Sequence, residues 1–375
     1  MFTAALASLL LLNGCQSLPT PADSAQIPAT PVVDTGRRLM LSDILPVLAQ
    51  KRVVLVGETH DQYQHHLGEL AVIEGIYHYY PNIAIGLEFF QQPFQQYLDQ
   101  YVAGEIDEQT MLRKTEYYER WRFDYRLYKP ILDFARAHRI PLIALNLPAE
   151  ITEQVGRQGM QSLSAKQRAQ IPATIDRNVP GYRERIENIF NRHPSGMQHN
   201  VDNFIDVQLL WDEGMAARAA DYLKQHPDKH MIILAGSGHI IHGTGIPVRL
   251  KRRIDGEIAT LVFGDRLKIT PDLADYVLFP PKASLPRQGL IGVILASADQ
   301  GLKVVSFSDD SLAPAAGMKK GDRIVEVQGK PVNSLADIRL ALLNQKPHDR
   351  VAVTVLRDRG SGVSPQRLRF RVELR

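Results

Sequence analysis

The sequence predicts an α/β protein with a mostly parallel sheet and helices on both faces, followed by a small β-rich domain. Short apolar runs rich in β-branched residues, such as 53–56 and 231–234, alternate with helical periodicity over the first 270 residues. After a proline-rich linker at 271–286, the pattern changes to short strands around one helix. A length of 375 residues with 44% apolar residues suits two domains with separate cores.

The first fifteen residues resemble a bacterial lipoprotein leader. Residues 2–12 are apolar or small, too short to span a bilayer, and suit a signal peptide over residues 1–14. They lead into Leu12-Asn13-Gly14-Cys15, which resembles a lipobox with an unusual residue at Asn13. Cys15 is the only cysteine, so the chain has no internal disulfide, and the alternative to lipidation is a buried free thiol. We expect a lipid-anchored envelope protein that faces the periplasm, on the outer membrane.

The composition that follows separates an anchor from a folded body. Residues 15–37 are rich in Pro, Ala, Ser and Thr and have no apolar periodicity, which predicts a tether. The α/β domain is then expected over residues 38–270. The formal charge is only +3, with both signs mixed along the chain, so nucleic acid is not an expected partner.

Strands and helices alternate along the first domain as in a parallel sheet. A long helix with apolar periodicity is predicted within the last helical section, at 201–223. The expected strands are 53–56, 82–90, 141–146, 231–234 and 258–263, and the expected helical sections are 62–80, 94–137 and 149–225.

Polar side chains follow the predicted strands where each strand ends. Two of these strands lead into Gly57-Glu58-Thr59-His60 and Gly236-Ser237-Gly238-His239, and a third ends at Glu88. The carboxyl ends of parallel strands meet at one edge of the sheet, where such folds bind ligands. We therefore expect both histidines and Glu88 to line one crevice.

Two imidazoles with one or two carboxylates suit two different chemistries. His60, Glu88 and His239 could bind a divalent metal ion, with Glu58 or Glu88 as the general base of a hydrolysis. Alternatively, the same edge could bind haem, whose iron accepts His or Tyr ligands. Tyr63, three residues after His60, is the tyrosine best placed by sequence, with a packing role as the alternative.

Other residues carry less weight as ligands. Trp211 and Met215, one helical turn apart, are expected in the core. The remaining histidines considered are His65, His66, His193, His199 and His242.

The ordered motifs of the first domain resemble the ChaN family of haem-binding lipoproteins, within the Tiki, TraB and erythromycin-esterase superfamily. The resemblance implies haem binding linked to iron acquisition. Other branches are metal-dependent hydrolases and proteases, and their two Gly-x-x-His motifs and glutamate fall on His60, Glu88 and His239, with Glu58 beside the first. Both chemistries stay open. The motifs are 57–61, 86–90, Gln208, Trp211-Asp212, Met215-Ala216, 235–239 and 245–250.

Residues 287–375 resemble a bacterial PDZ domain, a small β-sandwich. The resemblance rests on 290–293, an expected helix within 311–318, and the Gly-Asp-Arg-Ile turn at 321–324. It implies that the C-terminal peptide of an envelope protein adds a strand to the sheet. The alternative is a PDZ unit that docks on its neighbouring domain or forms a homodimer. The residues expected to contact the peptide are Leu290, Ile291, Gly292, Val293, Leu335 and Ile338.

Overall fold

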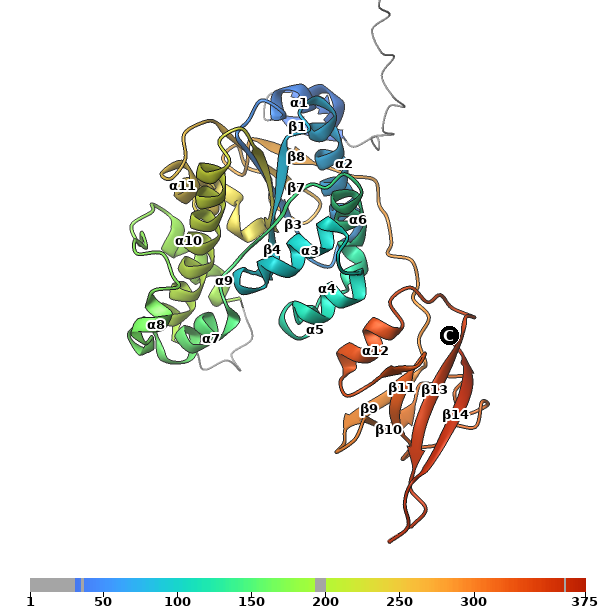
Figure 1. Ribbon diagram of the computed structural model, residues 1–375. Helices are drawn as coiled ribbons and strands as arrows, with labels where there is room; N and C mark the ends of the chain where they lie inside the picture. The colour runs from blue at the N-terminus through green and yellow to red at the C-terminus, as the bar shows by residue number, and fades with distance from the viewer. Residues whose placement is uncertain (1–30, 35–36, 193–199, 361) are drawn as a thin grey trace, which may run out of the picture.

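The computed structural model describes residues 31–34, 37–192, 200–360 and 362–375, and these form two domains (Figure 1). The first contains an eight-stranded sheet in the order β2-β1-β8-β7-β3-β6-β4-β5. Its six strands from β8 to β5 run parallel, as the sequence predicts. At the other edge, β1 (Pro31–Asp34) and β2 (Arg37–Met40) run antiparallel.

The central strands are continuous apolar runs because both faces of the sheet are covered. Every residue of β3, in the middle of the sheet, is buried. The parallel strands are β3 (Val53–Glu58), β4 (Ile83–Gln91), β5 (Leu142–Asn146), β6 (His230–Gly236), β7 (Ile258–Phe263) and β8 (Tyr276–Leu278).

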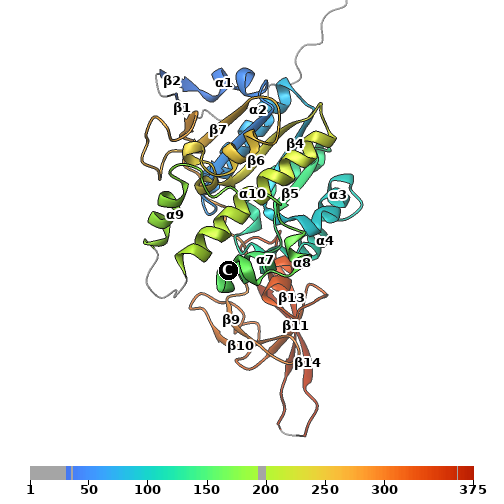
Figure 2. The same ribbon diagram turned by 90° about the vertical axis from the view of Figure 1, so that its left-hand side faces the viewer.

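Helices cover the two faces and bury two separate cores. On one face lie α1 (Leu41–Leu48), α2 (Tyr63–Tyr79) and α6 (Lys129–Ala137); on the other lie α10 (Val201–Gln225) and α11 (Ile246–Lys251), and Figure 2 shows α10 across the sheet. Shorter helices connect them. These are α3 (Gln95–Ala103), α4 (Glu108–Lys114), α5 (Tyr117–Arg120), α7 (Ala149–Gln158), α8 (Ala165–Arg168) and α9 (Tyr182–Phe190), with single 3-10 turns at Gln92–Phe94, Tyr125–Leu127, Met160–Ser162, Ser237–His239 and Ile241–Gly243.

The α/β domain is longer at both ends than the sequence indicated. β1 lies within the segment expected as a tether, and β8 lies within the expected linker, where it pairs with β7 and β1. β8 has only three residues and β1 four, too short for a periodicity signal. The expected signal peptide, Cys15 and residues 16–30 and 35–36 of the expected tether lie outside the described residues. Within the part described, no helix combines the length and apolar content needed to cross a membrane.

The second domain is an antiparallel sheet in the order β14-β13-β11-β10-β9, with β12 paired to β11. β9 pairs only with β10, so it forms the edge at which a peptide strand was expected. The expected helix within 311–318 is instead a hydrogen-bonded turn, because Gly317 adopts a left-handed conformation (φ 101°) that ends any helix. The elements are β9 (Val293–Ser297), β10 (Leu302–Phe307), β11 (Arg323–Val327), β12 (Lys330–Pro331), α12 (Leu335–Ala341), β13 (Arg350–Arg357) and β14 (Gln366–Glu373).

The two domains touch through α12, which lies beside α4 and α5 (Figure 1). Asp337 of α12 pairs with Arg113 of α4. The guanidinium of Arg339 lies 5.5 Å from the ring centroid of Tyr118. Leu340, just beyond, is buried in the same apolar cluster as the helices of the first domain. The second domain is therefore docked on its neighbour, one of the arrangements that the sequence left open.

Candidate functional site

The carboxyl ends of three adjacent strands bring the predicted polar residues together. Glu58 at the end of β3 pairs in register with Gly236 at the end of β6. The backbone amide of Gly236 donates a 2.6 Å hydrogen bond to Oε2 of Glu88, which extends from β4 on the other side of β6. Asn146 at the end of β5 donates to the backbone oxygen of Glu88 at 3.2 Å. Residues from four strands therefore meet at this edge of the sheet.

His60 is held by one ring nitrogen and open at the other. Its Nδ1 is hydrogen-bonded to the Glu58 carboxylate, whereas its Nε2 has no hydrogen-bond partner among the described residues. The side chain is 27% exposed. Burial opposes a charge on the ring, but the bond to Glu58 and the charge on Glu88 outweigh it and raise the pKa of His60 to about 9.

The ring of His60 lies directly against the backbone at Gly236, the first residue of the second Gly-x-x-His motif. A Cβ atom added to Gly236 would be 3.0 Å from Cε1 and 3.2 Å from Nε2 of His60. This distance is tighter than ordinary van der Waals contact, so glycine at position 236 lets the two motifs approach each other.

His239 lies between two carboxylates. Its Nδ1 is 2.7 Å from Oδ1 of Asp212, and its Nε2 is 3.3 Å from Oε1 of Glu88. Burial alone would lower the pKa of His239, but these two carboxylates raise it to about 10. Burial likewise opposes the charge of Glu88, and His239 and His60 outweigh it and lower the pKa of Glu88 to about 2. At neutral pH the crevice therefore contains a buried ion pair.

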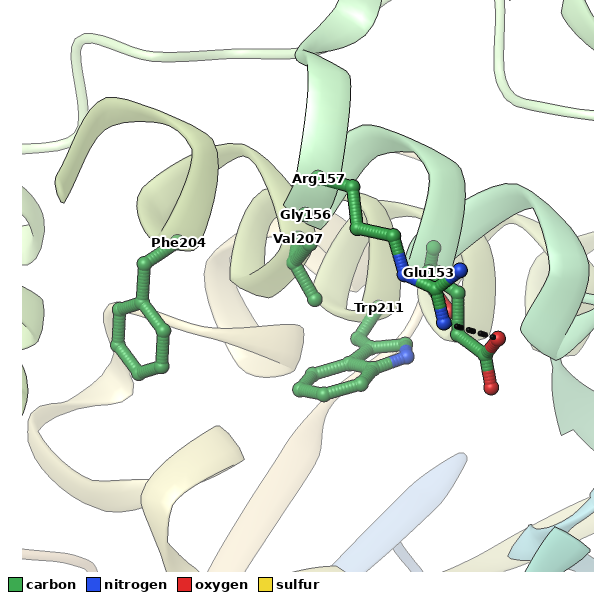
Figure 3. Close-up of a pocket in the computed structure, with 7 residues that line it drawn as sticks. Glu153, Gly156, Arg157, Phe204, Val207 and Trp211 are labelled. Carbon is green, nitrogen blue, oxygen red and sulfur yellow. Dashed lines mark hydrogen bonds and ion pairs between the residues drawn. The ribbon is translucent and has the colours of Figure 1, made fainter. Parts of the chain in front are cut away.

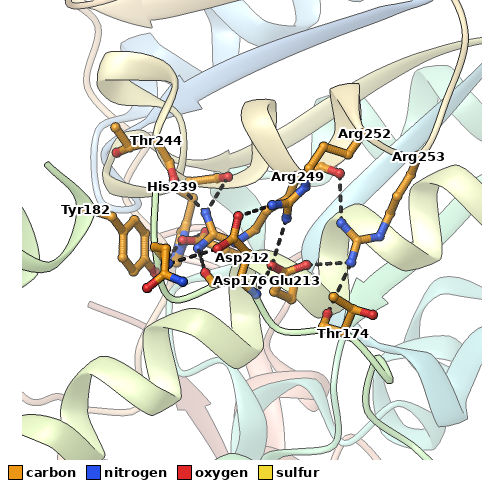
Figure 4. Close-up of polar contacts among 12 residues, drawn as sticks. Thr174, Asp176, Tyr182, Asp212, Glu213, His239, Thr244, Arg249, Arg252 and Arg253 are labelled. Carbon is orange, nitrogen blue, oxygen red and sulfur yellow. Dashed lines mark hydrogen bonds and ion pairs between the residues drawn. The ribbon is translucent and has the colours of Figure 1, made fainter. Parts of the chain in front are cut away.

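A polar network behind His239 fixes Asp212 (Figure 4). The hydroxyl of Tyr182 donates to Oδ2 of Asp212 at 2.7 Å. The next residue, Glu213, pairs with Arg249 of α11 at 3.1 Å, and both side chains are fully buried. Arg253 also bonds Glu213. Because removing one partner of a buried pair leaves an uncompensated charge, this network holds α10 and α11 in a fixed relation to the crevice.

Asp212 was not among the site residues predicted from the sequence, although it belongs to one of the motifs that resemble the ChaN family. The available signal was an acidic residue within the apolar stripe of a predicted helix: Asp212 and Glu213 are both buried between Leu210 and Met215. Buried acids require partners, so such a position indicates a polar network.

Aromatic side chains cover the open side of His60. Its ring centroid lies 4.8 Å from that of Trp121, in an edge-on arrangement, and 4.9 Å from that of Phe123. Trp121 is itself held by a 3.1 Å hydrogen bond to the Tyr128 hydroxyl. Between the two rings, Arg122 is exposed and has a left-handed backbone (φ 71°). These aromatic residues could not be predicted as part of the site, because they lie in a turn without periodicity.

A second layer of acids and imidazoles lies beneath His60. The ring of His66 bonds the backbone oxygen of His60 at 3.1 Å and the carboxylate of Glu69 at 2.9 Å. Glu69 is fully buried, and burial raises its pKa well above the usual range. Oε1 of Glu69 and Oε2 of Glu58 have no hydrogen-bond partner in the described chain.

An apolar hollow of about 290 Å³ opens between α7 and α10 (Figure 3). Trp211 and Val207 line it, and Gly156 leaves room for it. The ring of Trp211 is also edge-on to His239, with 6.1 Å between centroids. Trp211 is only half-buried, whereas Met215 lies fully in the core as expected.

The weaker candidates from the sequence have other contacts. Tyr63 is half-buried against the core under α2, and no described contact joins it to His60. His65 stacks on Phe263, with 4.4 Å between centroids, and bonds Asp265. His242 pairs with Asp272 at 2.8 Å on the surface. His193 and His199 lie outside the described residues.

The geometry gives no support to the divalent-metal alternative. Within the described ranges, no group of three His, Cys, Asp or Glu side chains is arranged to hold a metal ion. Both nitrogens of His239 bond carboxylates, so neither is free to donate to a cation.

Comparison with known families agrees with the arrangement of the strand-end motifs. Residues 44–250 match the model of the family described as haem-binding uptake, Tiki superfamily, ChaN. The chain belongs to the ChaN family. Residues 289–361 match the PDZ domain model, so a PDZ domain follows the ChaN domain.

Parts of this chain are similar to solved structures and to a curated relative. The structure described as cofacial haem binding to ChaN of Campylobacter jejuni has a TM-score of 0.54 at 19% identity, over 67% of this chain and 97% of that chain. The HtrA3 PDZ domain bound to a phage-derived ligand aligns with 24% of this chain and 86% of its own, at 21% identity and a TM-score of 0.19. The Arabidopsis thaliana protein RETICULATA-RELATED 5, chloroplastic, is 22% identical over 203 residues, and this chain spans about a quarter of its length.

The residues of the ChaN domain fit a haem group. An axial ligand needs a free imidazole nitrogen, and a carboxylate on the opposite nitrogen commonly orients such a ring. In His60, Nδ1 bonds the Glu58 carboxylate and Nε2 has no hydrogen-bond partner among the described residues; because its pKa is raised to about 9, the ring would release a proton at Nε2 on binding iron. The porphyrin needs apolar walls, which Trp121 and Phe123 supply, and its carboxylates need a cation, for which Arg122 is exposed nearby.

Proposed function

We propose that this chain is a lipid-anchored protein of the bacterial envelope that binds haem at His60 for iron acquisition. Its PDZ domain would bring the haem-loaded domain to the C-terminal peptide of a partner protein. Haem is the cargo in this proposal, and the chain's own residues bind and orient it.

The observation that carries the proposal is that Nε2 of His60 has no hydrogen-bond partner among the described residues, while Nδ1 is bonded to Glu58. Glu58 fixes the ring through Nδ1, and the backbone of Gly236 supports its edge. Glu88 and His239 then fix the position of Gly236 rather than contacting the iron. Tyr63 becomes the second choice as axial ligand, because it packs against the core.

Absorption spectroscopy on the full chain tests this assignment. Titration with haemin is expected to give a saturable, shifted Soret band, and His60→Ala is expected to weaken binding at least about tenfold, because an axial bond is lost. His242→Ala is the matched control, since this histidine lies away from the strand ends and its ring bonds Asp272. An unshifted band, or equal titrations for His60→Ala and the wild type, would contradict haem binding at this residue.

The exposed edge of β9 in the PDZ domain supports the proposal that a peptide binds there. Ile294 on this edge and Leu335 at the start of α12 are more than half exposed, and Ile338 lies in the core beneath them. Gly292, with φ 75°, places the preceding loop beside the edge. Apolar C-terminal peptides from a displayed library are expected to bind the full chain, and Leu335→Glu is expected to abolish their selection.

Lipidation at Cys15 and the outer-membrane location are tested in cells. The wild-type chain is expected in the detergent phase of an envelope extract and in the outer-membrane fraction, whereas Cys15→Ser is expected in the aqueous phase. Equal partitioning of the two proteins would contradict the anchor. Homodimer formation, which the sequence left open, is measured by light scattering with and without haemin.

A further inference from the structure

The PDZ domain carries a positive charge that the rest of the chain does not. Residues 287–375 contain fifteen Lys and Arg against nine Asp and Glu, an excess of six in a chain whose total is +3. The remaining residues are therefore net acidic. Such asymmetry between domains indicates that one of them meets an anionic partner.

The excess is concentrated on the solvent face of the hairpin formed by β13 and β14. Residues that lie directly opposite in an antiparallel pair share a face. By register, Arg367, Arg369 and Arg371 lie opposite Leu356, Thr354 and Ala352. Arg350 lies opposite Glu373 on the same face, while Val351, Val353 and Val372 on the other face are fully buried in the core.

Two of these arginines have no ion-pair partner among the described residues. Arg367 pairs with Glu326, and Arg350 pairs with Glu373 at 3.0 Å. The guanidinium groups of Arg369 and Arg371 are exposed and form no ion pair with the described residues.

The same arginines line a hollow. Arg350, Arg369 and Arg371, together with Gln328, Ala352 and Phe370, line a depression of about 480 Å³. Charges on an outer strand also discourage edge-to-edge association of sheets. Preventing association requires only charged residues at the edge of the sheet. Here three arginines also line a hollow on the solvent face of the hairpin.

We propose that this face of the PDZ domain, which we call the arginine face (Arg350, Arg369 and Arg371), docks on a membrane surface rich in anionic phospholipid headgroups. Its guanidinium groups would bond headgroup phosphates bidentately. The turn of the β13–β14 hairpin extends away from the ChaN domain (Figure 1), and Arg350, Arg369 and Arg371 are all exposed. This contact does not depend on haem binding or on an acyl chain.

Vesicle co-sedimentation tests the proposal with the full chain carrying Cys15→Ser, so that no acyl chain contributes. At about 0.1 M salt, binding is expected to vesicles containing about 30% phosphatidylglycerol and not to pure phosphatidylcholine, because Debye screening still permits contact attraction. The double variant Arg369→Glu and Arg371→Glu is expected to weaken binding by tenfold or more, since each basic residue near an anionic surface contributes about fivefold.

The matched control is Lys319→Glu with Lys320→Glu, which changes the net charge equally. Both lysines are exposed and follow Gly317, where an added Cβ would be 3.0 Å from the ring of Phe370. Phe370 also lines the hollow, but neither Lys319 nor Lys320 does. The control is expected to bind within about twofold of the parent.

Three results would overturn the proposal. The first is absence of binding to the anionic vesicles, and the second is an equal loss in the two double variants. The third is complete displacement by glycerol phosphate at constant ionic strength, which would assign the hollow to a free phosphate. Unchanged thermal midpoints show that each variant is folded.

Discussion

Nδ1 of His239 lies 2.7 Å from Oδ1 of Asp212, a residue of α10 that the Tyr182 hydroxyl holds from its other side. His239, which ends the second Gly-x-x-His motif, is therefore fixed by a helix on one face of the sheet. Glu88 fixes it from a neighbouring strand. Protonated His239 forms buried ion pairs with both carboxylates and so helps to hold the fold together. It leaves His60 as the imidazole that is free to bind a ligand.

Replacing Asp212 by Asn is expected to lower the pKa of His239 from about 10 by about one unit or more, because one of its two anionic partners is lost. The amide still accepts from Tyr182, so the fold is retained at a cost of about 1–3 kcal/mol. The titration is followed by NMR at the Cε1 proton of His239. Asp272→Asn, at the exposed His242 pair, is the control and should leave that midpoint unchanged.

Stability should fall at both ends of the pH range. The pKa of Glu88 is depressed from 4.5 to about 2, so its contribution is present above pH 4.5 and is lost as the pH falls toward 2. The pKa of His239 is raised from 6.5 to about 10, so its contribution is present below pH 6.5 and is lost as the pH rises through 10. Urea unfolding is expected to show maximal stability between pH 4.5 and 6.5. The free energy of unfolding there should exceed its value at pH 10 by on the order of a few kcal/mol.

His239→Gln tests the alkaline limb of this dependence. The variant should be less stable near pH 6 and should lose less stability between pH 6.5 and 10 than the wild type, because the group that titrates there is absent. An unchanged alkaline limb would show that His239 does not carry the buried charge.

The two glycines of the second motif should respond differently to alanine. An added Cβ at Gly236 lies 3.0 Å from the His60 ring, so Gly236→Ala must displace that ring. At Gly238 an added Cβ meets no atom within 4 Å. Gly236→Ala is expected to weaken haemin binding about tenfold or more, comparable with loss of the axial ligand. Gly238→Ala should bind as the wild type does, and a similar loss in both would refute the contact.

The sequence predicted the parallel sheet and the meeting of His60, Glu88 and His239, because buried strands and strand-end polar residues are local patterns. It did not predict the wall formed by Trp121 and Phe123. Those residues lie in a turn whose course depends on packing against α2 and β4, and a turn of this kind has no period to detect. The different roles of His60 and His239 could not be predicted from the sequence either, because only the hydrogen bonds of each ring nitrogen distinguish the two residues.

The contact between domains should contribute to stability through apolar packing more than through its ion pair. Leu340 is buried in the core cluster of the ChaN domain, so Leu340→Ala is expected to cost about 2–5 kcal/mol. Arg113 is half exposed, and Arg113→Ala should cost less than about 1 kcal/mol. Calorimetry of the full chain measures both, with Leu335→Ala as an exposed control on the same helix. Equal effects of Leu340→Ala and Leu335→Ala would contradict this packing.

Arg122 should determine how strongly the ChaN domain prefers porphyrins with free carboxylates. It is exposed between the two rings that contact His60, its left-handed backbone costs about 1 kcal/mol or more, and it forms no ion pair with the described residues. Arg122→Glu is expected to weaken haemin binding about tenfold while leaving binding of a haemin dimethyl ester within about twofold, because only free carboxylates pair with the guanidinium. Arg139→Glu is the matched control, since Arg139 is also exposed, with φ 52°. If Arg122→Glu affected both porphyrins equally, the arginine would support the backbone of the wall rather than select its ligand.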